Sequence, residues 1–385
     1  MARIAIKAKE MEKQALTYRQ TAAFVMWTVI NCIFVFKYAY RLSMPIAVIS
    51  TLLYGAVACL PVWLCLKRGL QFPGWVWAVM LGGVTVVSAI VFGHVPVETI
   101  RVDRWEMIQI FWDSVHNGIY PYAVHSPAGN YPGPMPVYFL IAYPFYLMQE
   151  IGWLGVIAAW LTFLYVKSRH TTPQRYTFIM LSLLLSATLY YEIVTRSTIL
   201  LNSIIFMFYY AGLKNLHRYS CRRFYAYAVL GGIVLSTRNV FAIPMILWGM
   251  SVLVTRQIPF ARFCAWCLCF ILSFALTFLP FFVAGPQQFL SYNPFVVQGD
   301  AILPFAHIVA FILLAFVLPL LFGKRTDVVL LSAVMFFAVI TYHVMYAIAD
   351  IGICAYLQGG ADISYYIFCI PFIIELLSQK EYDRQ

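Results

Sequence analysis

Charged residues are scarce in this chain of 385 residues: 11% are charged, whereas 63% are hydrophobic. A water-soluble domain needs roughly 25% charged residues to keep its surface hydrated. The mean hydropathy is +0.81. Cysteines are also few, nine in all, and none lies in residues 94–135, the longest polar segment. This composition excludes a soluble protein and a disulfide framework, and it predicts an integral membrane protein.

Apolar runs recur along the whole chain. A helix that crosses about 30 Å of hydrocarbon needs roughly 20 apolar residues at 1.5 Å per residue. We therefore expect an all-α polytopic membrane protein with about twelve transmembrane helices. The predicted ranges are 20–37, 45–66, 74–93, 136–167 (broken near Gln149), 176–191, 198–213, 224–238, 240–255, 260–283, 303–322, 327–348 and 363–378.

The positive charges predict the orientation of these helices, because Lys and Arg resist translocation. With a cytoplasmic N-terminus, the cytoplasmic side receives most of the 26 Lys and Arg residues. Residues 1–19 lack an apolar core and a cleavage site, so we expect a basic cytoplasmic segment and no signal peptide. The basic pI is then explained by the cytoplasmic excess of Lys and Arg and by their contact with anionic membrane lipids. No nucleic-acid partner is expected. The predicted organisation is 1–19 cytoplasmic, 20–93 three helices, 94–135 outer loop, 136–378 helical core and 379–385 cytoplasmic tail.

The outer loop contains an amphipathic segment, residues 103–117. On a helical wheel Trp105, Ile108 and Phe111 share one face and the acidic residues share the other. This pattern predicts an interfacial helix, with its apolar face on the membrane and its acidic face toward the outer compartment or a cavity. The spacing Asp103-x-x-Glu106 predicts a capping box, and a glycine follows the helix.

Short motifs in and after this loop resemble a family. The chain has an acid at the helix start (Asp103), then Gly118-Ile-Tyr-Pro-Tyr122, Tyr131-Pro-Gly-Pro134 and Pro144-Phe145. This order resembles the first outer loop of membrane glycosyltransferases of the glycosyltransferase-C superfamily, and in particular the polyprenyl-phosphate-sugar-dependent mannosyltransferase-like members. Family members usually have one span before this loop, whereas three are predicted here, so the resemblance gives no role to 20–37 and 45–66.

Two weaker matches to motifs of the family occur later in the chain. One is Gly231-Gly232 with Arg238 before Ala242-Ile-Pro244. The other is Asp362-Ile-Ser-Tyr-Tyr366 leading into Ile370-Pro-Phe372.

The resemblance implies transfer of a sugar, with inversion, from a polyprenyl-phosphate donor to a hydroxyl of a lipid or glycan acceptor at the outer face. Inversion requires a base for the hydroxyl proton and positive charge for the departing phosphate. The site residues it implies are Asp103 as catalytic base, Arg238 and Arg196 at the donor phosphate, and Glu106, Asp113, His125, Tyr131 and Asp362 at the acceptor or sugar.

Each assignment has a structural alternative. Asp103 could only cap its helix, and Glu106 or Asp113 could be the base instead or could belong to a solvated acidic face. Arg196 could pair with Glu192, and either arginine could reach the headgroups. No His or Asp spacing indicates a metal site, although ligands from distant loops leave a divalent ion open; no cofactor is predicted.

Two other functions compete with glycosyl transfer. A protein resembling O-antigen polymerases or ligases would also have about a dozen spans, but those proteins tend to have their polar outer loop in the later half. A lipid or solute transporter is expected to show two related halves or charges in broken helices at mid-membrane. This sequence has an early loop and shows neither feature.

Overall fold

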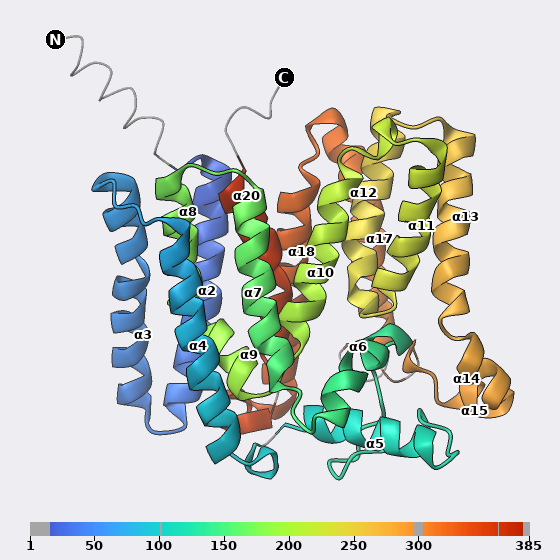
Figure 1. Ribbon diagram of the computed structural model, residues 1–385, viewed down its shortest axis with the longest axis horizontal. Coiled ribbons are helices and arrows are strands. Elements are labelled where there is room, and N and C mark those ends of the chain that lie inside the picture. The colour runs from blue at the N-terminus through green and yellow to red at the C-terminus, as the bar shows by residue number, and fades with distance from the viewer. Residues whose placement is uncertain (1–15, 101, 296, 298–302, 361, 380–385) are drawn as a thin grey trace.

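The computed structural model describes residues 16–100, 102–295, 297, 303–360 and 362–379, and the regular structure in these ranges is helical throughout (Figure 1). Within these described ranges, five helices are long and apolar enough to cross a membrane. They are α2 (Tyr18–Tyr40), α3 with its π-helical extension (Met44–Lys67), α4 (Gly74–His94), α17 with its last turn (Phe305–Arg325) and α18 (Val328–Ile351).

Three further candidate spans are pairs of helices bent at a short break. The helices α6 (Pro136–Leu147) and α7 (Gly152–Ser168) meet at 115°, and α8 (Pro173–Leu184) and α9 (Ala187–Val194) meet at 49°. The third pair joins Ile353–Gly359 to Ser364–Ser378, which includes α20 (Ile370–Ser378), at 71°. If each pair is one span, the described residues contain eight candidates. The structure is therefore that of a helical membrane protein with five to eight candidate spans.

The predicted ranges match the observed helices closely in position, and each of the twelve contains helix. Several observed helices are short for a bilayer: α10 (Ile199–Leu213), α11 (Cys221–Leu235), α12 (Ala242–Thr255) and α13 (Phe260–Leu276). After α13 come two six-residue helices, α14 (Leu279–Ala284) and α15 (Pro286–Ser291). A short helix crosses only where the bilayer thins or the protein surrounds it.

The break predicted near Gln149 is present but is sharper than one kinked span. Gln149 adopts a positive φ of 57°, a conformation that rarely continues a right-handed helix. As a result α6 runs away from α7 instead of extending it (Figure 1). From the sequence, 136–167 is predicted as one broken span because both helices are apolar.

The Gly231-Gly232 pair has a packing role. These glycines lie in α11, which packs along α13, and a Cβ on Gly232 would collide with Ser273 and with the backbone at Phe270. The absent side chains allow the two helices to approach closely, as small residues do at interfaces between membrane helices.

Both ends of the described chain lie at one end of the bundle, with the start of α2 and the end of α20 at the top of Figure 1. Gln20 Nε2 donates to the Gln379 carbonyl at 3.0 Å. Nearby, the buried Glu375 carboxylate accepts from Arg169 at 2.6 Å and from Lys214 at 2.8 Å. Cations predicted to be cytoplasmic thus neutralise a buried acid at this end.

The amphipathic segment forms α5 (Arg104–His116) at the opposite end, beside α6 (Figure 1). Phe111 is buried and stacks on Phe139 of α6, with ring centroids 3.6 Å apart and planes 2° from parallel. Trp112 Nε1 donates to the Phe139 carbonyl at 3.1 Å. The helix ends before Gly118, whose φ of +68° suits glycine. Part of the apolar face predicted to lie on lipid therefore packs on protein.

The predicted capping box does not form. Asp103 occupies the N-cap position of α5, but its side chain makes no capping hydrogen bond to the helix. The backbone at Asp103 has φ −82° and ψ 20°, away from the extended conformation usual for a capping residue. The carboxylate is directed to the loop that follows α5.

Candidate functional site

A polar cleft of about 710 Å³ lies at the α5 end of the molecule. Its walls come from the end of α2, the start of α5, Tyr191 of α9, the loop at 127–130, and the segment around Asp362. Six charged residues line it: Asp103, Glu106, Asp362, Lys37, Arg41 and Arg104. Carboxylates and cations from three separate parts of the sequence therefore share one space.

Asp103 is held in the cleft wall by the outer loop. Its Oδ2 atom accepts hydrogen bonds from Asn130 Nδ2 at 2.7 Å and from Ser126 Oγ at 3.0 Å. A turn positions these donors, since the Ser126 amide donates to the Asn130 carbonyl at 2.9 Å. Among the described residues, neither a hydrogen bond nor an ion pair reaches Oδ1 of Asp103. The carboxylate is fixed through one oxygen while the other remains able to accept a proton.

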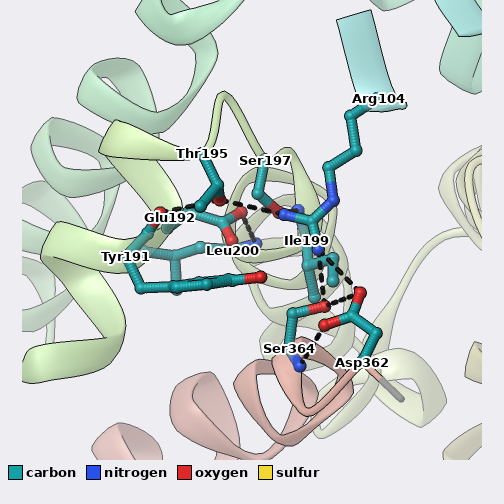
Figure 2. Close-up of polar contacts among 9 residues, drawn as sticks. All are labelled: Arg104, Tyr191, Glu192, Thr195, Ser197, Ile199, Leu200, Asp362 and Ser364. Atoms are coloured by element: carbon teal, nitrogen blue, oxygen red, sulfur yellow. Dashed lines mark hydrogen bonds and ion pairs between the residues drawn. The ribbon is translucent and has the colours of Figure 1, made fainter. Parts of the chain in front are cut away.

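Arg104, the next residue, has different partners from Asp103 and joins three elements; Figure 2 shows its guanidinium beside Thr195, Asp362 and Ser364. Its guanidinium donates to Asp362 Oδ2 at 2.9 Å, to Ser364 Oγ at 2.7 Å and to Thr195 Oγ1 at 3.1 Å. The planar guanidinium presents five donors in fixed directions, which suits three acceptors on different segments. Arg104 thereby ties the start of α5 to the end of α9 and to the segment before α20.

Asp362 is the charged partner in this cluster. Burial by itself raises the pKa of a carboxyl, but the Arg104 guanidinium and the bonds from Ser364 hold the pKa of Asp362 below its usual value. The Ser364 amide donates to Asp362 Oδ1 at 2.8 Å. Asp362 is therefore an anion in the folded protein at neutral pH. Arg104 and Ser364 hold its carboxylate in place.

A second carboxylate, Glu192, lies next to the cluster (Figure 2). It is fully buried in α9, and its Oε1 atom accepts from the Leu200 amide at 2.6 Å. This bond satisfies a free amide in the first turn of α10. Glu192 thus fixes the α9–α10 turn that carries Thr195.

The end of α2 contributes two cations. Lys37 is buried, with Nζ 4.3 Å from the centre of the Tyr356 ring. The Arg41 guanidinium lies 4.7 Å from the centre of the Tyr38 ring. Both side chains line the cleft, so they bring positive charge to its wall.

Comparisons of the chain with protein-family models, with curated proteins and with solved structures found no match. The site is therefore described by its geometry alone.

The predicted phosphate-binding role of Arg196 is corrected by its surroundings. This residue is 1% exposed, and its guanidinium donates to the Val95 carbonyl at 2.7 Å, to the Val194 carbonyl at 3.1 Å and to Glu150 at 3.4 Å. Its partner is Glu150 and not Glu192, the acid weighed from the sequence. With its donors used in the protein, Arg196 acts as a structural link between α4, α7 and α9.

Arg238 lies outside the residues that line the cleft. Its guanidinium stacks over the Tyr138 ring, 4.8 Å from the centre, and its Nε atom is buried with no hydrogen-bond partner among the described residues. Tyr365 is close enough to Arg238, Arg104 and Asp362 for their charges to act on its hydroxyl. Arg238 thus borders the cluster from the α6 side.

The predicted acceptor residues divide into two groups. Glu106 and Asp362 line the cleft with Asp103. Asp113 does not: its Oδ1 atom accepts from Tyr146 Oη at 2.6 Å, which fastens α5 to α6. His125 and Tyr131 are in edge-to-face contact with each other, 6.1 Å between ring centres, on either side of the loop that holds Asp103.

Sequence reasoning missed Arg104, Lys37 and Arg41 as site residues. With a cytoplasmic N-terminus, these three residues belong to the few Lys and Arg expected on the outer side, and that rarity was the available signal. Among the described residues, no group of three or more His, Cys, Asp or Glu side chains is arranged to hold a metal ion.

Proposed function

We propose that the protein is a membrane glycosyltransferase that moves a sugar, with inversion, from a polyprenyl-phosphate donor to a hydroxyl of a lipid or glycan acceptor. The observation that carries this proposal is the cleft in which Asp103 shares one space with Lys37, Arg41 and Arg104. Such a reaction needs one base and a few cations, and both are present within that cleft.

In the proposed reaction the acceptor hydroxyl gives its proton to Asp103 Oδ1 as its oxygen bonds to the anomeric carbon. The bond between that carbon and the phosphate oxygen breaks on the opposite face, so the configuration inverts. The polyprenyl phosphate leaves with the electron pair, and the cations of the cleft stabilise its added negative charge. Lys37 and Arg41 replace Arg196 in this role, and Arg238 stays a candidate from the α6 side.

The orientation belongs to the same proposal. If the shorter helices also cross, the chain makes about twelve passes with both termini in the cytoplasm, and the cleft opens at the outer face of the cytoplasmic membrane. The cleft lies at the start of α5, and α5 is at the end of the bundle away from the start of α2 and the end of α20 (Figure 1), which supports this arrangement. The dense cations near Glu375 support a cytoplasmic assignment of the other end.

The first prediction concerns Asp103. In liposomes supplied with polyprenyl-phosphate sugars and acceptors, Asp103→Asn is expected to lower kcat by roughly 100-fold or more, because a positioned general base contributes that much. Asp350→Asn is the control, since it removes an exposed carboxylate at the end of α18, outside the cleft. Release of polyprenyl phosphate is the measurement.

Two outcomes would count against the proposal. Full activity of Asp103→Asn would remove the base assignment. A wild-type protein that releases no polyprenyl phosphate with any of several sugars and acceptors would contradict the whole reaction class. Thermal unfolding of both variants separates lost chemistry from lost structure.

A further inference from the structure

A second, apolar groove lies beside the polar cleft. It has a volume of about 310 Å³, at the lower end of the range for ligand pockets. One wall is a stripe of α2 that runs from Thr28 to Lys37, and the others are Thr51 of α3 and the turn at Tyr356 and Leu357. Lys37 lines both the groove and the cleft, so the two spaces meet at its side chain.

The walls of the groove offer little to a polar ligand. Its two threonine hydroxyls donate to their own helices, Thr28 to the Phe24 carbonyl at 3.0 Å and Thr51 to the Ala47 carbonyl at 2.7 Å. Val29, Ile33 and Phe36 complete the α2 stripe. A hydrocarbon chain is the ligand that such walls suit.

Polar groups gather only where the groove reaches the cleft. Tyr356 is 3% exposed, and its hydroxyl is buried without a hydrogen-bond partner among the described residues. A buried hydroxyl without a partner is costly, so it marks a place where a ligand acceptor can bind. The ammonium of Lys37 lies over the same ring. The junction therefore presents a positive charge and a free donor.

We propose that this groove holds the hydrocarbon chain of a lipid phosphate and that the phosphate sits at the junction, near Lys37 and the Tyr356 hydroxyl. The inference rests on the proposed function and names the binding path of its donor. It also gives a role to α2 and α3, the two helices for which the family resemblance has no counterpart. The sugar attached to the phosphate would then extend into the cleft, toward Asp103.

Charge and shape argue for a lipid phosphate over a bulk phospholipid. A phospholipid carries two chains and a substituted phosphate, whereas this groove has a volume of only about 310 Å³. Its polar end opens on a cleft that also contains Arg41 and Arg104, which suits an anion with a hydroxylated substituent.

The test measures binding of farnesyl phosphate, farnesol and inorganic phosphate to the purified full-length protein in nanodiscs. Val29→Trp and Thr51→Trp would each fill the groove from a different helix. Both are expected to weaken farnesyl phosphate binding by at least about tenfold and to leave inorganic phosphate binding unchanged. The matched controls are Val25→Trp on α2 and Leu52→Trp on α3, which are 54% and 70% exposed and do not line the groove.

The head group is tested with Lys37→Met and Tyr356→Phe. Each is expected to weaken farnesyl phosphate and inorganic phosphate binding and to have little effect on farnesol. A photoreactive farnesyl phosphate should label α2 and α3 near residues 28–51, and excess unlabelled farnesyl phosphate should prevent the labelling while excess phospholipid should not.

Unchanged farnesyl phosphate binding in both groove-filling variants, or labelling that phospholipid abolishes, would overturn the inference. These results would leave the Asp103 proposal standing. Conversely, farnesyl phosphate that binds the wild type and is lost in Val29→Trp would support the groove even if no sugar were transferred. The two failures are therefore distinguishable.

Discussion

At the residue scale, the adjacent residues Asp103 and Arg104 have different partners and different roles. Asp103 turns toward Ser126 and Asn130, while Arg104 turns toward Asp362, Ser364 and Thr195. One residue contributes a carboxylate with a free oxygen, and the next locks three segments around it. A single turn of backbone at the start of α5 therefore sets both the proposed chemistry and the frame that holds it.

The Arg104–Asp362 pair makes stability depend on pH. Because the pKa of Asp362 is lower in the folded than in the unfolded protein, the pair stabilises the fold fully above the unfolded pKa of about 3.9 and less as the pH falls through the folded pKa. We expect Asp362→Asn to cost about 1–2 kcal/mol of stability at pH 7, since the side chain is 37% exposed. The difference from wild type should shrink as the pH falls below 4.

Thermal unfolding in detergent at pH 7 and at decreasing pH measures this effect. Asp350→Asn serves as the control, because Asp350 is an exposed carboxylate at the end of α18. A difference between Asp362→Asn and wild type that stays constant into the acid range would contradict the ion-pair account.

At the scale of elements, α5 is positioned by its contacts with α6. Phe111 stacks on Phe139, Trp112 donates to the backbone of α6, and Asp113 accepts from Tyr146. These contacts come from three successive residues, which point in directions about 100° apart, so α5 is held on more than one side. The position of Asp103 at its start depends on this docking.

Phe111→Ala is therefore expected to destabilise the protein by about 3–5 kcal/mol, because it removes a fully buried ring and leaves a cavity. Activity should fall as well, since α5 loses the packing contact with α6 that positions Asp103. Val115→Ala, on the same helix but 38% exposed, should change stability by less than about 1 kcal/mol. Unfolding temperature and turnover of both variants are the measurements, and equal effects would show that α5 is not docked as described.

The helices α2 and α3, which have no counterpart in the family resemblance, line the apolar groove, and α2 also lines the cleft. They lie side by side at one edge of the bundle (Figure 1), with Gly55 of α3 placed where a Cβ would stand 3.9 Å from Cys32 Sγ of α2. Their contact forms the floor of the apolar groove, and the end of α2 supplies Lys37 and Arg41 to the cleft.

At the scale of the whole molecule, the two ends of the bundle differ in charge and shape. One end has both termini of the described chain and the buried Glu375 with its cationic partners. The other has α5, α6, α14 and α15 (Figure 1), and the cleft lies beside the start of α5. Positive residues resist translocation, so the first end is expected to be cytoplasmic.

Single-cysteine labelling tests this orientation. In a variant in which the nine native cysteines are replaced, Ala128→Cys in the cleft loop is expected to react with a membrane-impermeant maleimide in cells whose cytoplasmic membrane is intact. His217→Cys, exposed between α10 and α11, should react only after that membrane is permeabilised. The reverse pattern would invert the topology and place the cleft in the cytoplasm.

The sequence by itself determined the membrane class, the positions of the helices and the existence of α5, because hydropathy and helical periodicity are local properties. It also singled out Asp103, Glu106 and Asp362, which do share the cleft. The assignment of glycosyl transfer stays a prediction that the activity assay must test.

Only the tertiary structure decided which charges meet. Arg196 is a cation near a helix end in the sequence, but folding buries it against Glu150, 46 residues away. Arg104 and Asp362 are 258 residues apart and pair directly. The same holds for the groove, whose walls are brought together from α2, α3 and Tyr356. Hydropathy depends on neighbours along the chain, whereas ion pairs and cavities depend on neighbours in space, and only the packing of the helices sets those.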